Sequence, residues 1–424
     1  MERPAIKEYQ SRAISYAIEN PYSILALDPG LGKSLCLIEV RKRLGIKCLV
    51  VCPSYLILNW QKEIRKWDDG SAKITMFRSG KELCRADDSD YIITSYDLVQ
   101  KAEYLFEWAD MVGLDEGHAI KSMKAKRTTF IHKNVYENST KRVHILTGTP
   151  IKNRVQEFYS LLALCFYNPS VADTKFLDLF PSEVDFADHF SHREEYSIPV
   201  RNRMVTIMKW TGLKNTKELK KWLVGKYIRI KSSDVLNLPP LSYKSLLISD
   251  TPDDALLGQF NAHFEGEGNK SINPTAKAEA ALKKAPFTIK YANNLLEEVD
   301  CLLIYTDHVA SAEAIAAAMG VTAITGKVPA NTRSAMADAF QAGQGNVLVA
   351  TIGSMKEGKD LFRSHHIIFN DYPWVPGDLK QVIYRIQRIG QTSPCTVHRI
   401  IGSPQDEYIM ETIQSKIETI EKAT

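Results

Sequence analysis

The chain has 424 residues and a mass of 47.8 kDa, so it exceeds the size at which one hydrophobic core usually stops growing, and two large domains are expected. A hydrophobic content of 44% and a charged content of 25% are those of an ordinary globular protein and exclude a disordered or fibrous class. The net charge of +4 is compatible with a polyanionic partner but is too small to indicate one.

The first residues, MERPAIKEYQ, are charged and lack the apolar run of a secretory signal. No later stretch approaches the roughly 20 apolar residues of a membrane span. The seven cysteines are scattered and form no CxxC pair, which argues against disulfides and against a structural zinc site. We therefore expect a soluble, monomeric protein with no membrane partner, in the cytoplasm or, as an open alternative, the nucleus.

The first predicted strand, Ser23–Leu27, leads into the loop DPGLGKS and then into an apolar helix. In this loop Gly30 and Gly32, with Leu31 between them, permit a tight turn whose backbone N–H groups point at phosphate oxygens. The order of strand, glycine-rich loop and helix predicts a nucleotide site.

The two residues after the loop glycines carry its chemistry. Lys33 places a positive charge near the β- and γ-phosphates of ATP, and the Ser34 hydroxyl is a ligand for Mg²⁺. The general pattern GxxxxGK[ST] requires glycine at position 27, where this chain has Leu27. The loop therefore needs support from other motifs.

Further strands are predicted in the first half, each followed by a longer amphipathic segment, as in a parallel sheet with helical crossovers. They are 48–52, 91–94, 111–114 and 143–146. After the third of them comes DEGH, where Asp115 can hold Mg²⁺ and Glu116 can orient and deprotonate the attacking water. The alternative is an acidic surface loop.

The last of these strands is followed by LTGTP. Thr147 and Thr149 are placed to sense the γ-phosphate, whereas the alternative is a simple Gly-Pro turn.

From about 151 to 231 the sequence becomes aromatic, basic and weakly periodic, and we expect a mostly helical insertion. Ten basic residues and one acid, Glu218, lie near its end; the basic residues are Arg201, Arg203, Lys209, Lys214, Lys217, Lys220, Lys221, Lys226, Arg229 and Lys231. A solvated helix face and a phosphate-contacting surface are equally compatible with them.

The stiff NLPPL run ends the first domain, so the predicted boundaries are 1–236 and 237–424. A second, shorter helical insertion is predicted over about 252–298. The strands predicted in the second half are 301–305, 321–324, 347–350, 366–369 and 396–400. Each half is thus expected to be an α/β domain with one doubly wound parallel sheet.

The segment Leu379–Ile389 is predicted to be a helix that ends at Gly390. Gln381, Arg385 and Arg388 stand at i, i+4 and i+7 and would project from one face. Two arginines on a helix are usually solvated or paired with acids. The alternative is an arginine finger that stabilises charge on the transferred phosphoryl group.

Together these motifs resemble the SWI/SNF-type remodelling ATPases of helicase superfamily 2. The matching segments are DPGLGKS, VVCPSYLILNWQKEIRKW, IITSYDLV, DEGHAIKS, LTGTPIKN, YIRIKSSDVLNLPPL and DYPWVPGDLKQVIYRIQRIGQ, and the segment YTDHVASAEAI is similar to the annealing-helicase branch. The resemblance implies two tandem RecA-like lobes with helical protrusions, ATP and Mg²⁺ as ligands, and double-stranded DNA as the partner.

The resemblance also implies roles for further residues. Gln10 matches the family's adenine-reading glutamine, and Gly358 and Asp360 lie in a segment that couples DNA to nucleotide. The residues that match DNA-contacting positions are Pro53, Ser54, Asn59, Trp60, Thr94, Ser95, Lys121, Thr351, Ser354 and Trp374. Trp60 is equally compatible with a place in the core. The chain departs from the family at Leu27 and Asp28, at Gly117 and at Val375.

Three functions follow as hypotheses. The first is an ATP-dependent translocase that tracks along duplex DNA and remodels DNA or protein–DNA complexes. The second is a helicase that separates or anneals strands at forks. The third is a nucleotide-gated DNA-binding switch with little turnover, against which the presence of Lys33, Asp115, Glu116 and Arg388 counts.

Overall fold

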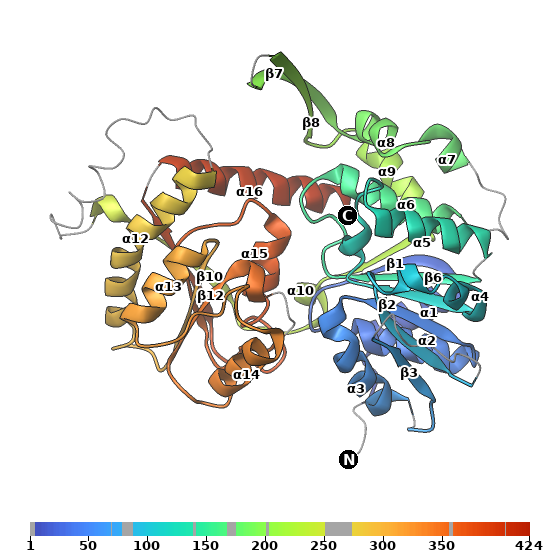
Figure 1. Cartoon of the computed structure of the whole chain (residues 1–424), viewed down its shortest axis with the longest axis horizontal. Helices are drawn as coiled ribbons and strands as arrows, with labels where there is room; N and C mark the ends of the chain where they lie inside the picture. The colour runs from blue at the N-terminus through green and yellow to red at the C-terminus, as the bar shows by residue number, and fades with distance from the viewer. Residues whose placement is uncertain are drawn as a thin grey trace. The chain divides into compact units, whose positions relative to one another are not determined.

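The computed structural model describes residues 5–68, 70–78, 88–138, 141–167, 175–200, 203–250, 274–355, 359–402 and 404–424. The chain divides into two compact units. Unit 1 comprises Met1–Val235 together with Lys416–Thr424, and unit 2 comprises Leu236–Ser415. Each unit is built around its own parallel sheet, which confirms the predicted α/β class (Figure 1).

Unit 1 contains a seven-stranded sheet in which every neighbouring pair of strands is parallel. Its strands are β1 (Tyr22–Leu27), β2 (Cys48–Cys52), β3 (Ile74–Phe77), β4 (Tyr91–Ser95), β5 (Met111–Asp115), β6 (Arg142–Thr147) and β9 (Tyr227–Ile230). Their order is β3-β4-β2-β5-β6-β1-β9. The five predicted strands are confirmed, and β3 and β9 extend the sheet at its two edges.

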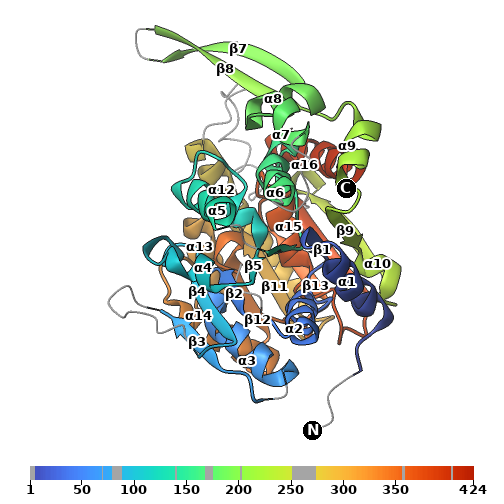
Figure 2. The ribbon, with the colours of Figure 1, turned by 90° about the vertical axis from the view of Figure 1, so that its right-hand side faces the viewer.

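Helices cover both faces of this sheet (Figures 1 and 2). They include α1 (Glu8–Glu19), α2 (Lys33–Leu44), α3 (Ile57–Trp67), α4 (Tyr104–Trp108), α5 (Lys126–Glu137) and α6 (Phe158–Phe166). Successive side chains of a strand point to opposite faces. In β5, Val112 and Leu114 therefore pack in one core with Phe158 of α6, whereas Gly113 faces Leu37 of α2.

The insertion predicted to be mostly helical contains a hairpin, which corrects that prediction. Its helices are α7 (Lys175–Leu179), α8 (Glu183–Phe190) and α9 (Thr216–Leu223). Between α8 and α9, β7 (His192–Val200) and β8 (Arg203–Thr211) pair antiparallel and extend away from the sheet (Figure 2). The strand RMVTIMKWT is rich in β-branched and aromatic residues, which favour a strand over a helix.

An aromatic cluster fixes the base of this hairpin. The rings of Phe166 and Phe176 stack with centroids 4.3 Å apart, and Trp222 of α9 packs edge-on against both. The indole of Trp210 in β8 donates a hydrogen bond of 2.7 Å to Asp188 of α8. The lower part of the hairpin is therefore attached to the helices of unit 1.

Unit 2 contains a five-stranded sheet, again with all neighbouring strands parallel. Its strands are β10 (Leu241–Leu247), β11 (Leu302–Thr306), β12 (Val347–Thr351), β13 (His366–Phe369) and β14 (Cys395–Ile401), in the order β10-β14-β13-β11-β12. Four predicted strands are confirmed. The predicted strand 321–324 is reduced to a single bridge between Ile324 and Ala350, and β10 was not predicted.

The helices of unit 2 are α12 (Pro274–Leu295), α13 (Val309–Ala318), α14 (Ala330–Gln341), α15 (Pro376–Ile383) and the first part of α16 (Pro404–Ala423). Helix α12 lies within the second predicted insertion, whereas 251–273 lie outside the described residues. The last residues of α16 belong to unit 1, where Ala423 is fully buried and Ile420 packs against the core.

A short helix, α10 (Ser232–Val235), ends the main part of unit 1. None of the helices among the described residues combines the length and apolar character needed to cross a membrane.

Candidate active site

Three motif loops meet at one edge of the unit 1 sheet. Strands β5, β6 and β1 are neighbours, and their carboxyl ends lead into DEGH, LTGTP and DPGLGKS. An added Cβ atom at Gly148 would lie 3.0 Å from Pro29, so the second and third of these loops touch. The carboxyl edge of a parallel sheet is the usual position of a ligand site in such folds.

The glycines of the phosphate loop adopt backbone conformations that other residues avoid. Gly30 and Gly32 have φ angles of 83° and 85°, in the left-handed region. A Cβ atom at Gly32 would lie 2.6 Å from the amide nitrogen of Gln10. That amide donates a hydrogen bond of 3.1 Å to the carbonyl of Leu31, so Gln10 holds the loop in addition to its predicted contact with adenine.

The loop ends where α2 begins, at Lys33. The Lys33 ammonium donates a hydrogen bond of 3.2 Å to the carbonyl of Leu27, which places it over the loop. Ser34 lies in the first turn of α2 and is partly exposed. The first N–H groups of a helix have no partner within the helix and attract anions. The loop thus combines a helix N-terminus, a positive charge and a hydroxyl.

Asp28, one of the departures from the family, is a buried anion that fixes the start of the loop. Its carboxylate forms an ion pair of 2.5 Å with Arg229 and accepts hydrogen bonds from the N–H and hydroxyl of Ser232. Arg229 also donates to the carbonyl of Ala26. Arg229 is therefore a structural residue and does not belong to a solvated or phosphate-contacting face.

The carboxylate of Asp115 is buried at the end of β5. It accepts a hydrogen bond of 2.8 Å from the indole of Trp60. Burial and the neighbouring charge of Glu116 raise its pKa to about 6, whereas the charge of Lys33 acts in the opposite direction. A buried carboxylate that is costly to ionise gains most from a nearby cation.

Glu116 has a φ of 50° and a ψ of 56°, a left-handed conformation that costs a residue with a side chain about 1 kcal/mol. Its carboxylate lies 3.2 Å from Nδ1 of His118. Gly117 follows because the space for a larger residue is filled: an added Cβ atom would lie 2.3 Å from Cγ2 of Ile145. The sequence departure at Gly117 thus has a steric cause.

Thr147 and Thr149 are both buried in the LTGTP loop. The hydroxyl of Thr147 accepts a hydrogen bond of 3.1 Å from the backbone N–H of Thr149. Within the described part of the chain, the Thr149 hydroxyl has no hydrogen-bond partner. A buried hydroxyl without a partner is costly and is satisfied by an acceptor such as a phosphate oxygen.

These features fit a nucleoside triphosphate with Mg²⁺. Gly30 and Gly32 form a tight turn with positive φ angles, the Thr149 hydroxyl lacks a partner among the described residues, and Lys33 carries the compensating charge. Ser34 and Asp115 offer the oxygen ligands that Mg²⁺ prefers.

The predicted DNA-contacting residues of unit 1 fall into two groups. Pro53 is partly exposed, and Ser54 and Asn59 are exposed. Trp60 is 1% exposed and Thr94 is fully buried, so contacts of these two side chains with DNA are excluded in this conformation.

Two further residues of this set are held by hydrogen bonds or an ion pair. Ser95 is buried and its hydroxyl accepts from the N–H of Leu98. Lys121 forms an ion pair of 2.6 Å with Glu157.

In unit 2, Thr351 and Ser354 lie at the carboxyl end of β12 and are buried. The Thr351 hydroxyl donates to that of Ser354, which itself donates to the carbonyl of Ile324. Trp374 is partly exposed and contacts the ring of Tyr408 at a centroid distance of 6.3 Å. Gly358 lies outside the described residues.

The two predicted arginines follow α15 and do not lie on it. The helix ends at Ile383, after which the N–H of Arg385 bonds three residues back and that of Arg388 only two residues back. The chain unwinds toward Gly390, whose φ is 104°. The prediction that Gln381, on the helix, shares one helical face with both arginines is therefore wrong.

Each arginine is nevertheless largely buried within unit 2. Arg388 forms an ion pair with Asp360, which was predicted separately as a nucleotide-site residue. Burial lowers the pKa of Arg388 and the charge of Asp360 opposes that effect. Arg385 is 8% exposed, and its positive charge acts on the buried Tyr305 hydroxyl.

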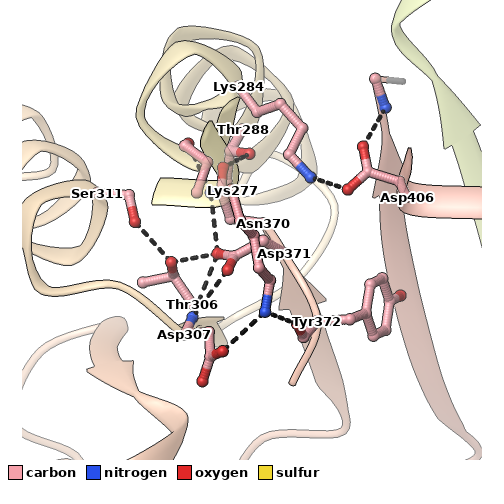
Figure 3. A network of polar contacts seen from close by, with 12 residues as sticks. Lys277, Lys284, Thr288, Thr306, Asp307, Ser311, Asn370, Asp371, Tyr372 and Asp406 are labelled. Carbon is pink, nitrogen blue, oxygen red and sulfur yellow. Dashed lines mark hydrogen bonds and ion pairs between the residues drawn. The ribbon is translucent and has the colours of Figure 1, made fainter. Parts of the chain in front are cut away.

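A buried polar network in unit 2 was missed by sequence reasoning (Figure 3). Lys277 of α12 forms an ion pair of 2.8 Å with Asp307 and donates to the carbonyl of Tyr372. About two turns further along α12, Lys284 forms an ion pair of 2.6 Å with Asp406. Lysines in a helix normally indicate a solvated face, so their burial gave no signal in the sequence.

Comparison with known families identifies both parts of the chain. A family model described as the SNF2-related domain matches residues 9–257, and one described as the helicase conserved C-terminal domain matches residues 288–390.

Individual relatives are distant but match nearly the whole chain. The DNA annealing helicase and endonuclease ZRANB3 of Bos taurus is 24% identical over 440 residues, which cover 96% of this chain and 39% of the relative. The SWI/SNF-related matrix-associated actin-dependent regulator of chromatin subfamily A-like protein 1 of Xenopus tropicalis is 25% identical, with 98% and 44% covered. The chain thus spans less than half the length of either relative.

A solved structure, the Sulfolobus solfataricus SWI2/SNF2 ATPase core in complex with dsDNA, is 20% identical with a TM-score of 0.46, covering 96% of this chain and 90% of that one. The SNF2-related model alone matches more than half of the 424 residues. The chain therefore belongs to the SNF2-related domain family.

Proposed function

We propose that the protein is a DNA-dependent ATPase that hydrolyses ATP to ADP and phosphate while it tracks along double-stranded DNA. The observation that carries the proposal is the convergence of three loops in unit 1, which brings Lys33, Asp115 and Thr149 to adjacent strand ends. Membership of the SNF2-related family supports the ATPase class.

In the proposed reaction Lys33 binds the β- and γ-phosphates, and the Thr149 hydroxyl donates to a phosphate oxygen. Ser34 and Asp115 would hold Mg²⁺, which neutralises charge on the phosphates when bound. Glu116 accepts a proton from the attacking water, and His118, 3.2 Å away, orients its carboxylate. Gln10 and Leu31 keep the loop in place throughout.

We propose that Arg385 and Arg388 of unit 2 stabilise the negative charge that develops on the transferred phosphoryl group. In the structure Arg388 is paired with Asp360, so it must exchange this partner before it can act on phosphate. Arg388→Ala is expected to abolish hydrolysis at saturating ATP, whereas rapid turnover by this variant rules out the assignment. Arg363→Ala is a matched control, because Arg363 donates to the carbonyls of Phe340 and Gly345 instead.

The DNA partner is supported by the relatives, since the bovine one is named as a DNA annealing helicase. Exposed Ser54 and Asn59 and the cation Lys121 are the proposed contacts of unit 1, with Trp374 in unit 2. Such contacts go mainly to phosphates, so binding should be sensitive to salt and nearly blind to sequence.

One titration tests the proposal. ATP turnover is measured with duplex, single-stranded and forked DNA and with RNA, for the native protein and for Lys33→Ala and Glu116→Gln. We expect strong stimulation by duplex DNA, no turnover by either variant and retained ATP binding by Glu116→Gln. Full stimulation by RNA or single-stranded DNA, without stimulation by duplex DNA, would falsify the proposal that the protein tracks along duplex DNA.

A strand-annealing or strand-separating activity at forks is the second candidate, favoured by the bovine relative, which is a DNA annealing helicase by name. A strand-displacement assay run beside a triplex-displacement assay separates the two activities. A translocase clears only the third strand of the triplex, whereas a helicase also releases a strand of the fork. Turnover at background level with every nucleic acid would instead support a nucleotide-gated switch.

A further inference from the structure

Three lysines of α9 share one face of that helix, which we call the lysine face. Lys217, Lys220 and Lys221 stand at i, i+3 and i+4 of α9, so their Cβ atoms lie about 5 to 6 Å from one another. All three residues are exposed. The helix therefore presents three positive charges to the solvent within about one turn.

The opposite side of α9 is fixed to the rest of unit 1. Leu219 and Leu223 are buried in the core of this unit, and the ring of Trp222 packs edge-on against two phenylalanine rings. Before the first turn, the amide of Asn215 donates a hydrogen bond of 2.9 Å to the carbonyl of His189. These contacts hold the helix in one orientation, with the lysine face directed away from the core.

The acids near α9 are engaged with other partners. Glu218, the single acid of this helix, has its carboxylate 2.9 Å from Nε2 of His189. On α8, Asp188 accepts a hydrogen bond from the indole of Trp210 and forms an ion pair with Arg193. Within the part of the chain that the structure describes, none of the three lysines forms an ion pair. Three lysines against one glutamate leave the helix with a net positive charge.

Helix stability accounts for two of the lysines but not for the third. Lys220 and Lys221 lie in the last turn of α9, where positive charges interact favourably with the helix dipole. Lys217 lies in the first turn, where the helix dipole repels a cation. Its charge is also repelled by that of Lys221 at i+4. A cation at this position is expected where the helix binds an external anion.

We propose that the lysine face of α9 binds backbone phosphates of duplex DNA and so extends the DNA-binding surface of unit 1 to this helix. This inference rests on the proposed function. Phosphates that bind there relieve the repulsion among the three ammonium groups and release counterions from the DNA. A lysine acts on phosphate as a point charge on a flexible stem, which suits contacts that do not depend on base sequence.

The composition of this face favours nucleic acid over a protein partner. Lysine is depleted in protein–protein interfaces, whereas clusters of lysine and arginine along a helix are typical of nucleic-acid surfaces. The helix lies within the stretch 201–231, which holds ten basic residues and the single acid Glu218. Since that acid is directed to His189, the charge of the lysine face is complementary to the regular negative charge of a DNA backbone.

The test is the salt dependence of duplex binding, measured by fluorescence anisotropy with the full chain. Each lost phosphate contact reduces the slope of log affinity against log salt by about 0.9. The triple variant Lys217→Gln/Lys220→Gln/Lys221→Gln, which keeps a similar helix propensity, should therefore lose roughly 2.7 units of slope.

A second triple variant controls for the change in net charge. Lys141→Gln/Lys283→Gln/Lys422→Gln removes the same charge from exposed positions that lie far apart in the sequence. It should lose less than about 0.9 units of slope, the equivalent of one contact. A loss in the lysine-face variant that is no larger than the loss in this control overturns the inference.

Lys217→Gln alone separates binding from folding. It should lower the slope by about 0.9 and leave the thermal midpoint of unfolding unchanged or raise it, because it removes a cation from the first turn. If the lysine-face variant keeps the native slope on duplex DNA but loses affinity for poly-glutamate, the face binds an acidic protein segment and the inference is overturned. If the native protein itself fails to bind duplex DNA, the proposed function fails first, whatever the variants do.

Discussion

The indole Nε1 of Trp60 donates a hydrogen bond of 2.8 Å to Oδ2 of Asp115 across 55 residues of sequence. Trp60 is buried under the carboxyl edge of the sheet, so it acts through Asp115 and not on DNA. The bond lowers the pKa of a carboxyl group whose pKa burial raises. Trp60 is therefore a positioning residue for the proposed metal ligand.

Replacement of Trp60 by Phe should remove this donor and keep most of the packing. A hydrogen bond to a charged group contributes roughly 1.5 to 3 kcal/mol, so we expect a loss of stability of about that size. The pKa of Asp115 should also rise. The acid limb of the pH profile of kcat/KM should therefore move to higher pH.

Trp67→Phe is the matched control for this experiment, since the indole of Trp67 on the same helix donates to Glu63 near the surface. It should leave the acid limb in place. An acid limb that stays unchanged in Trp60→Phe as well would contradict the positioning role.

Asp115 also makes the stability of the free protein depend on pH. Its pKa is raised from 3.8 to about 6 in the folded state, so between these values the folded state binds more protons than the unfolded state. The free energy of unfolding therefore includes a favourable contribution from Asp115 below about pH 4. This contribution is lost as the pH rises through 6. The shift corresponds to roughly 3 kcal/mol at most.

The variant Asp115→Asn cannot ionise and should escape this loss. Relative to the native protein, it should gain up to roughly 3 kcal/mol between pH 4 and pH 8, measured by urea unfolding without nucleotide or metal. One of the two donors facing the carboxylate loses its acceptor in the variant, but that cost is the same at every pH. A stability difference independent of pH would contradict the buried charge.

The sequence alone predicts those parts of the site that lie within one short segment of the chain. The loop Asp28–Ser34 and the DEGH and LTGTP loops each follow an apolar run, and parallel strands bring such ends to one edge. The bonds from Trp60 to Asp115 and from Arg229 to Asp28 could not be predicted, because they join residues 55 and 201 positions apart.

The errors of the sequence-based prediction have physical causes of their own. The aromatic, basic and weakly periodic character of 151–231 predicts helices, but the β-branched and aromatic residues within it form the hairpin β7–β8. Around Arg385 and Arg388 the spacing fits a helix, yet Arg388 turns toward Asp360 and the chain unwinds before Gly390. In both places a tertiary contact or a local strand preference prevailed over helical periodicity.

Gly117 offers a steric test of the DEGH loop. Gly117→Ala would place a Cβ atom 2.3 Å from Cγ2 of Ile145 and should destabilise the protein by roughly 1 to 3 kcal/mol. It should also slow ATP hydrolysis, because Glu116 is the preceding residue. Ile145→Leu removes the branch at Cβ and should restore part of both losses, whereas Ile145→Val keeps Cγ2 and should restore neither. Equal effects of the two second substitutions would rule out this contact as the cause.

The ion pair of Lys284 with Asp406 tests how α12 is attached to unit 2 (Figure 3). Lys284→Met removes the positive charge and leaves the carboxylate of Asp406 buried, which should cost roughly 3 to 5 kcal/mol in urea unfolding. Asp406→Asn in the same chain removes the unpaired buried charge and keeps an acceptor for the N–H of Gly402, so the double variant should regain most of the loss.

Lys283→Met, exposed on the same helix, is the control and should change stability by less than about 0.5 kcal/mol. Additive losses in the double variant would show that the two side chains contribute independently, and the attachment of α12 would then rest on its apolar contacts instead.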